Sequence, residues 1–247
     1  MEAQEREQEK EKIKQIIQER GIKHLFRFTP LENLDYILRD GLKSRELIEQ
    51  ERNKYPDAIF PDNVRADRRR NGICLSISFP NDEMFPRFRQ RINSHWAIIV
   101  LDINLILEIK DRQISFFDTN SANSKFRNID NKTLETATAF ESLFAEKVAD
   151  KYKTWHRSEF YNENMFYKRC PTSVQAEVMV AGHIETDYIR AVILDTKELA
   201  SHYFDKYSYT YEDPDGLFII DSPYGFFYDE KCFDKREDYL YYLKFWQ

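Results

Sequence analysis

The stretch PTSVQAEVMV, residues 171–180, passes from a polar loop into an apolar run and decides how the rest of the chain is interpreted. The run AEVMVAG predicts a strand, and Glu177 stands at its start. Side chains two residues apart on a strand share one face, so Gln175 and Glu177 would present an amide and a carboxylate to one ligand. The alternative is a polar pair that faces solvent on an edge strand, and the pattern alone leaves both open.

Working outward from this strand, the sequence predicts strands and helices in irregular order. Apolar periodicity, Pro30 at a helix start and glycines just past helix ends mark these elements. Because the two types do not alternate regularly, we expect an α+β fold and not a doubly wound sheet. The expected helices cover residues 3–20, 30–40, 82–93 and 133–149, and the expected strands cover 24–29, 73–79, 96–103, 114–117, 176–182 and 188–195. From 196 we expect a helix, a hairpin with turns at DPDG and SPYG, and a closing aromatic helix.

Composition bounds the class of protein. The 247 residues include 19 Phe and 15 Tyr but only 6 Gly, which excludes a disordered or low-complexity chain. The net charge of −6 argues against non-specific binding of nucleic acid, which needs Lys and Arg to neutralise phosphates. Acidic residues concentrate at the N-terminus and in the last fifty residues, however, while basic clusters occupy the middle, which leaves room for a local basic groove.

The sequence contains no motif for several common classes of site or targeting segment. The three cysteines Cys74, Cys170 and Cys232 form no CxxC pair, so we expect neither a metal site nor disulfides, and the reducing cytoplasm is the natural compartment. The charged N-terminus lacks the apolar core of a signal peptide, and no apolar run approaches the ~18 residues of a membrane span. Without a GxGxxG or P-loop motif, any NAD site here is not of the Rossmann type.

Two segments in the first third of the chain are candidates for binding a nucleotide. The segment LFRFTPLENL, residues 25–34, predicts a strand followed by a helix, which places backbone N–H groups and a hydroxyl where a nucleotide could lie. In NVRAD, Arg65 and Asp67 could form a fixed pair with the guanidinium forked onto a pyrophosphate. The alternatives are an ordinary strand–turn–helix and a solvated charged loop.

The stretch 151–169 interleaves basic and aromatic residues. Cations catch phosphates and aromatic faces stack on unpaired bases at roughly 1–3 kcal/mol per base, so this mixture is typical of a loop that binds single strands. The alternative is an aromatic loop folded over the core. The DNA-binding candidates are Lys153, Trp155, His156, Arg157 and Arg169.

Taken together, these segments resemble the DarT family of DNA ADP-ribosyltransferases, toxins that are paired with a macrodomain antitoxin of the DarG type. The matching order is LFRFTPLENLDYILRDGL, NxRxD, LSISFPNDEMF, WAIIVLD, TNSA and PTSVQAEVMV, over residues 22–195. LSISFPN and TNSA look closer to the branch that modifies guanine than to the thymidine branch. The resemblance thus implies a toxin that attaches ADP-ribose to a base of single-stranded DNA, with a role in phage defence.

The resemblance also implies a fold and a set of site residues. The fold is of the ADP-ribosyltransferase type, a split β-sheet core surrounded by helices, and NAD is the co-substrate. Glu177 is the catalytic carboxylate and Arg65 holds phosphate or the transition state. The implied NAD contacts are Arg27, Phe28, Thr29, Asn33, Gly41, Leu42, Asp67 and Gln175. Many family members carry His where this chain has Arg27; an arginine could hold the ribose or a phosphate, but it cannot act as a neutral acceptor.

We divide the chain into three parts. Residues 1–21 form an N-terminal helix, and residues 22–195 form the core, which includes a substrate-recognition loop at 150–172. Residues 196–247 form a C-terminal extension packed on the same domain. Three other functions stay open at this stage. They are an ADP-ribosyltransferase that acts on RNA or protein, a non-catalytic module that only holds a nucleotide or a partner, and a structural protein in which the motifs coincide by chance.

Overall fold

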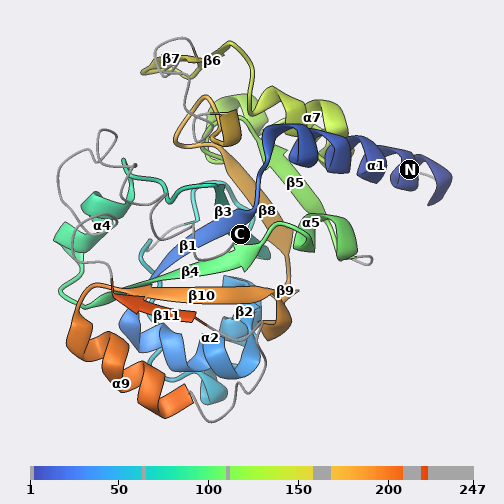
Figure 1. Cartoon of the computed structure of the whole chain (residues 1–247). Helices are drawn as coiled ribbons and strands as arrows, with labels where there is room; N and C mark the ends of the chain where they lie inside the picture. The colour runs from blue at the N-terminus through green and yellow to red at the C-terminus, as the bar shows by residue number, and fades with distance from the viewer. Residues whose placement is uncertain (1–2, 63–64, 110–111, 158–167, 208–217, 222–247) are drawn as a thin grey trace.

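A computed structural model describes residues 3–62, 65–109, 112–157, 168–207 and 218–221 (Figure 1). The strands are β1 (His24–Pro30), β2 (Leu42–Lys43), β3 (Gly72–Ile77), β4 (Trp96–Asp102), β5 (Ile114–Phe117), β6 (Lys147–Ala149), β7 (Thr154–His156), β8 (Glu177–Ala181), β9 (His183–Ile184), β10 (Ile189–Leu194) and β11 (Phe218–Asp221). The α-helices are α1 (Ala3–Arg20), α2 (Leu34–Asp40), α3 (Arg45–Gln50), α4 (Phe85–Arg91), α5 (Leu105–Glu108), α6 (Asn131–Leu134), α7 (Ala137–Ser142) and α9 (Lys197–Tyr207). Short 3₁₀ turns are η1 (Leu31–Asn33), η2 (Arg52–Lys54), η3 (Ser124–Phe126) and η5 (Thr186–Tyr188).

A seven-stranded sheet in the order β11-β10-β4-β1-β3-β8-β5 forms the centre of the molecule. Its neighbours are antiparallel except for the parallel pair β10–β11. The central strand β4 is buried along its β-branched run, as its unbroken apolar sequence predicts. The mixed architecture around an antiparallel sheet confirms the expected α+β class.

The sheet splits between β1 and β3. Strand β1 pairs with β4 along its whole length, from His24↔Asp102 to Pro30↔Trp96, but with β3 only at Leu25↔Ile77 and Phe26↔Ser76. Beyond Phe26 the two strands separate, because β1 continues along β4 while β3 continues along β8. The backbone therefore opens a wedge between residues 27–30 and 72–75, which is the split core that the resemblance implies.

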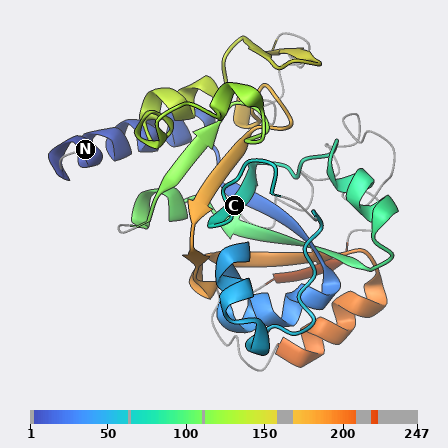
Figure 2. The same cartoon turned by 180° about the vertical axis from the view of Figure 1, so that it is seen from behind.

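Helices cover the two ends of this sheet. Helix α1 packs against α7 and α5, with Ile13 and Ile17 at 4 % and 6 % exposure, while α9 packs against β10 and β11 (Figures 1 and 2). Gly41 ends α2 with φ of +77°, and a Cβ there would collide with the carbonyl of Ile184 in β9. Glycine is required at this turn because it alone fits both the left-handed backbone and the close approach.

Two expected helices differ from the structure. The helix expected over 133–149 is wrong in its second half: α6 and α7 are separate, Thr136 Oγ1 caps α7 by accepting from Ala139 N at 3.2 Å, and 147–149 form a strand. Helix α4 is shorter than expected, since Asn81 Oδ1 accepts from the N–H groups of Glu83 and Met84 in a turn that precedes it. The hairpin turns and closing helix expected after Tyr207 lie outside the described residues.

Candidate active site

Glu177 is the first residue of β8 and pairs with Phe117 of β5. This register brings the TNSA segment, residues 119–122, over the carboxylate: Asn120 Nδ2 donates to Oε1 at 3.3 Å and Ser121 N donates to Oε2 at 3.1 Å. Glu177 is only 8 % exposed, and burial raises its pKa above the ordinary carboxyl value. Hydrogen bonds from Ser121 lower the pKa and the charge of Asp67 raises it, while Arg65 lowers it.

Arg65 and Asp67 form the fixed pair that their spacing predicts. Arg65 Nε and Nη2 donate to the two oxygens of Asp67 at 3.1 and 2.7 Å, a bidentate geometry. Arg65 Nη2 also donates to the carbonyl of Arg69 at 3.0 Å, and Ser121 Oγ donates to Asp67 at 3.2 Å. Although burial opposes the charge, Cys74 and Asp67 raise the pKa of Arg65. One network thus links Glu177 through Ser121 and Asp67 to the guanidinium.

A cavity of about 240 Å³ lies in the wedge between β1 and β3 and exposes Glu177 to its interior. A second cavity of about 70 Å³ adjoins it and shares four lining residues with it, Arg27, Pro61, Asp62 and Arg65. The two cavities run from Glu177 along the split toward α2. Their shape suits an elongated ligand, with an apolar wall of Phe28, Met84 and Phe88 near the carboxylate.

Nearly all of the expected NAD contacts line these cavities. Phe28, Asp67 and Glu177 line the first, Thr29, Asn33, Gly41 and Leu42 line the second, and Arg27 and Arg65 line both. Their convergence is a consequence of the split, because residues 27–29 no longer pair with β3 and line the cavities instead.

Two of these residues hold the walls in place. Arg27 is half-buried and donates from Nη1 to the carbonyl of Cys74 at 2.8 Å, so it bridges β1 and β3 across the split. The side chain of Asn33 donates to Thr29 Oγ1 and to the carbonyl of Ile59, and accepts from Ile59 N. These bonds fix the shape of the second cavity before any ligand enters.

Gln175 lies outside the strand that begins at Glu177, so strand alternation does not place the two side chains on one face. The strand begins only at Glu177, and Gln175 Nε2 donates to Glu83 Oε2 at 2.6 Å. Gln175 lines neither cavity. Its expected contact with NAD thus finds no geometric support, because the turn at Ser173–Ala176 redirects the backbone before the strand starts.

The expected DNA contacts are only partly on the surface. Trp155 is 1 % exposed, and Arg157 is buried with its guanidinium on the carbonyls of Cys170 and Lys168. Both are corrected to structural residues, since the β6–β7 hairpin turns them inward. Lys153 is exposed and pairs with Glu83, His156 and Arg169 are half-buried, and the aromatic residues within 158–167 lie outside the described residues.

Two residues beside the carboxylate were not expected as site residues. Asn120 and Ser121 bind Glu177 directly, whereas Tyr152, 86 % exposed at the tip of the β6–β7 hairpin, belongs to the basic and aromatic stretch expected to bind single strands. TNSA was the available signal for Asn120 and Ser121. No group of three or more His, Cys, Asp or Glu able to hold a metal occurs among the described residues, and no described helix has the length and hydropathy to span a membrane.

A split sheet with a carboxylate at the start of a strand beside the wedge is the arrangement of an ADP-ribosyltransferase. The family model "DarT: ssDNA thymidine ADP-ribosyltransferase, DarT" matches residues 26–208. The chain therefore belongs to the DarT family of enzymes that ADP-ribosylate single-stranded DNA.

Solved structures are similar to this chain at low sequence identity. Thermosipho africanus DarTG in complex with ADP-ribose has a TM-score of 0.52 and 17 % identity over 81 % of this chain, which spans only 50 % of that chain. Thermus sp. 2.9 DarT in complex with NAD+ has a TM-score of 0.45 and 10 % identity, covering 81 % of this chain and 95 % of that chain. The same Thermus protein with ADP-ribosylated single-stranded DNA gives 0.44 and 14 %, covering 80 % and 93 %. No curated protein matches the sequence.

Proposed function

We propose that this chain splits NAD and transfers ADP-ribose to a base of single-stranded DNA, with Glu177 as the catalytic carboxylate. The observation that carries the proposal is the network from Glu177 through Ser121 and Asp67 to Arg65 along the two cavities in the split. The family to which the chain belongs performs this type of reaction.

NAD would lie along the split with its nicotinamide end beside Glu177. The flat ring would contact Phe28, Met84 and Phe88, and the diphosphate would pass Arg65 and Arg27 at the junction of the two cavities. The guanidinium of Arg65 is held by Asp67 and is therefore already oriented when the dinucleotide binds. The rest of the dinucleotide would extend toward Thr29 and Asn33.

Glu177 would act on the ribose that bears nicotinamide. As the bond from the anomeric carbon to nicotinamide breaks, its electron pair leaves with nicotinamide and positive charge develops on the sugar. A carboxylate that accepts a hydrogen bond from the 2′-hydroxyl stabilises that charge, most strongly in a site with little water. A nitrogen of the acceptor base then forms the new bond to the anomeric carbon, and Glu177 takes the proton that this nitrogen loses.

Guanine is the acceptor base in this proposal. LSISFPN, residues 75–81, and TNSA, residues 119–122, both border the first cavity and resemble the guanine branch, whereas the family description names thymidine. An exocyclic amine is a poor nucleophile and benefits from a carboxylate that removes its proton during attack.

The test is mass spectrometry of single-stranded oligonucleotides incubated with enzyme and NAD. One oligonucleotide carries a single guanine, its control a single thymine, and RNA and total protein are incubated separately. We expect one ADP-ribose on guanine. Modification of thymine alone would overturn the base assignment, modification of only RNA or protein would overturn the DNA assignment, and absence of nicotinamide release would favour a non-catalytic nucleotide-binding module.

In the cell, this activity would make the chain a cytoplasmic toxin with a role in phage defence and a macrodomain antitoxin as partner. A DarTG structure from Thermosipho africanus was solved with ADP-ribose, the group that such a partner would remove. Expression of the chain alone should stop growth, and co-expression of a macrodomain hydrolase should restore it. Equal growth with the wild-type chain and Glu177→Gln would contradict the toxin proposal.

A further inference from the structure

A third cavity, of about 640 Å³, lies beside the proposed catalytic site on the same face of the sheet. On β8, Glu177, Met179 and Ala181 share one face by strand alternation. Glu177 lines the catalytic cavity, while Met179 and Ala181 line the third. Segment 65–71 forms the wall between them, since Arg65 and Asp67 border the first and Arg68 to Asn71 border the third.

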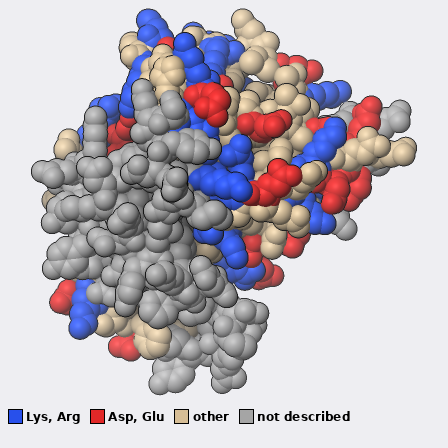
Figure 3. All heavy atoms as spheres, turned by 45° about the horizontal axis from the view of Figure 1, so that its top comes forward, with Lys and Arg blue, Asp and Glu red and all other residues tan. Residues whose placement is uncertain are grey.

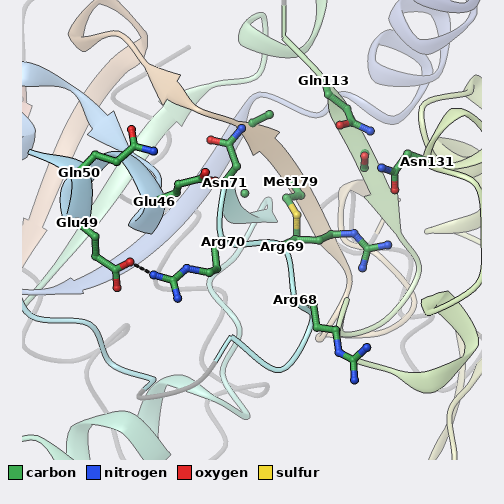
Figure 4. Close-up of a pocket in the computed structure, with 13 residues that line it drawn as sticks. Glu46, Glu49, Gln50, Arg68, Arg69, Arg70, Asn71, Gln113, Asn131 and Met179 are labelled. Atoms are coloured by element: carbon green, nitrogen blue, oxygen red, sulfur yellow. Dashed lines mark hydrogen bonds and ion pairs between the residues drawn. The ribbon is translucent and has the colours of Figure 1, made fainter.

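Three consecutive arginines from this wall line the third cavity, and they differ in their partners. Arg70 forms an ion pair with Glu49 of α3, as the dashed line in Figure 4 shows. Arg68 and Arg69 point to the opposite side of the cavity, away from Glu49 (Figure 4). Within the described part of the chain, neither of these two has a carboxylate partner. The side chain of Arg68 is exposed, whereas the guanidinium of Arg69 donates to the carbonyls of Asp67 and Phe126 and lies over the ring of Phe117.

The wall is held rigidly. Asp67 Oδ1 accepts from Arg69 N at 3.0 Å, Arg68 N donates to the carbonyl of Arg65 at 3.0 Å, and Arg69 Nη2 donates to the carbonyl of Phe126 at 3.3 Å. Arg68 has φ of +61°, a conformation that costs an L-residue energy, and its side chain is exposed. Asp67, which orients Arg65 for catalysis, thus also positions the two arginines of the neighbouring cavity.

We propose that this cavity binds a phosphodiester of the DNA strand that carries the acceptor base, with Arg68 as the principal contact and Arg69 beside it. The inference rests on the proposed function, whose acceptor strand must pass the mouth of the catalytic cavity. Guanidinium groups suit phosphate oxygens. The amide side chain of Asn131 lines the same side of the cavity as Arg69 (Figure 4) and can bind the sugar or base of that nucleotide, while Gln113 on that side donates from Nε2 to Glu135 Oε1 at 2.6 Å.

Charge favours a strand here, even though the net charge of the chain is −6. Figure 3 shows Lys and Arg interspersed with Asp and Glu on the described part of one face of the molecule. In the third cavity, the carboxylates of Glu46 and Glu49 stand on the α3 side, away from Arg68 and Arg69 (Figure 4). A phosphate is therefore attracted to one side of the cavity and repelled from the other, which gives the strand a defined path.

The experiment measures binding of a fluorescein-labelled single-stranded oligonucleotide to the Glu177→Gln enzyme at several salt concentrations. The test variant is Arg68→Asn, because asparagine tolerates the left-handed backbone. Arg68→Lys keeps the charge, and Arg39→Gln is a control that removes an exposed arginine lining none of these cavities. Thermal unfolding checks that each variant is folded.

We expect Arg68→Asn to weaken oligonucleotide binding at least 5-fold and to reduce the slope of log affinity against log salt by about 0.7, the contribution of one phosphate contact on a single strand. Arg68→Lys should restore most of the slope, and Arg39→Gln should change neither quantity. Unchanged affinity and slope for Arg68→Asn would overturn the inference.

Two further measurements distinguish a phosphate of the DNA strand from a phosphate of NAD and from free inorganic phosphate. In the otherwise wild-type enzyme, Arg68→Asn should leave the KM for NAD unchanged, and a raised KM would assign the cavity to NAD instead. Inorganic phosphate at matched ionic strength should not displace the oligonucleotide, and full displacement would indicate a free-phosphate site. If the wild-type enzyme binds DNA through Arg68 but modifies no base, the proposed function fails and this inference stands.

Discussion

In the proposed mechanism, Glu177 carries a negative charge at a position where burial disfavours the charge. Its pKa is raised by burial, lowered by the hydrogen bonds from Ser121 and raised by Asp67. Because the proposed mechanism requires the ionised form, we expect activity to be present above this pKa and lost as pH falls through it. We therefore expect the acid limb of log kcat/KM to lie above the ordinary carboxyl value of 4.5.

Variants of Ser121 and Asp67 should shift the acid limb of the pH–activity profile in opposite directions. Ser121→Ala removes a hydrogen bond that favours the carboxylate and should shift the limb to higher pH. Asp67→Asn removes a like charge and should shift it to lower pH, whatever it does to the maximal rate. Steady-state rates across the pH range measure both shifts, and a limb that moves the same way in both variants would contradict the assignment.

The charge on Glu177 should also lower the free energy of unfolding. A raised folded-state pKa means that the folded protein binds the proton more tightly than the unfolded chain, so stability falls as pH rises through that interval. Glu177→Gln mimics the neutral acid and should melt higher than wild type at pH 7, by about 2–4 °C for each kcal/mol gained. The difference should vanish in acid, below the unfolded value. A lower Tm of the variant at pH 7 would show that the charge stabilises the fold.

At the residue scale, the resemblance led to Glu177 and to most of the residues that line the two cavities, while the catalytic role of Glu177 stays a prediction. The sequence did not reveal that Trp155 and Arg157 are buried. Alternating basic and aromatic residues have the same pattern whether a loop faces DNA or packs on the core. The difference is made by tertiary contacts, here those of Arg157 with the 168–172 segment.

At the element scale, the β6–β7 hairpin allows a buried aromatic residue to be compared with an exposed one. Trp155 fills its base and Tyr152 stands exposed at its tip. We expect Trp155→Ala to lower the free energy of unfolding by about 3–5 kcal/mol and to impair every activity. Tyr152→Ala should leave stability nearly unchanged but raise the KM for single-stranded DNA about 5- to 150-fold, the equivalent of one lost base stack.

Chemical denaturation and transfer assays on both hairpin variants check this expectation. Hydrolysis of NAD in the absence of DNA is the internal control, and it should persist in Tyr152→Ala. Full DNA modification by Tyr152→Ala at low oligonucleotide concentration would show that the hairpin tip does not contact the strand.

Prediction of elements was most accurate where long-range pairing agrees with the local pattern. Strand β4 was recognisable from its apolar run, and α1 from Ile13, Ile16 and Ile17. The helix expected at 133–149 failed because Val148 fits a helical stripe equally well, yet 147–149 pair with 154–156. The pattern of apolar residues within one segment does not reveal this strand pairing, nor does it reveal where β1 and β3 separate.

At the scale of the whole molecule, α1 is part of the core and not an appendage. Ile13 and Ile17 are buried, Lys10 Nζ donates to the carbonyl of Leu107, and Glu9 accepts from Ala137 N. The family match at 26–208 begins after this helix and includes the whole of α9. The division of the chain at 21 and 195 therefore stays a prediction.

Removal of residues 1–20 should lower the Tm substantially, since each buried isoleucine contributes about 1.5–3 kcal/mol. The matched control removes only residues 1–8, whose described side chains are exposed, and should leave the Tm nearly unchanged. Calorimetry of both truncations measures the contrast. Equal melting of the two would show that α1 adds nothing to the stability of the core.

The most direct test of the central claim is mass spectrometry of a single-stranded oligonucleotide after incubation with NAD and either wild-type or Glu177→Gln enzyme at equal concentration. We expect wild type to add one ADP-ribose and the variant to be slower by on the order of 10²–10⁴, with its fold intact by circular dichroism. Full modification by a folded Glu177→Gln enzyme would contradict the account.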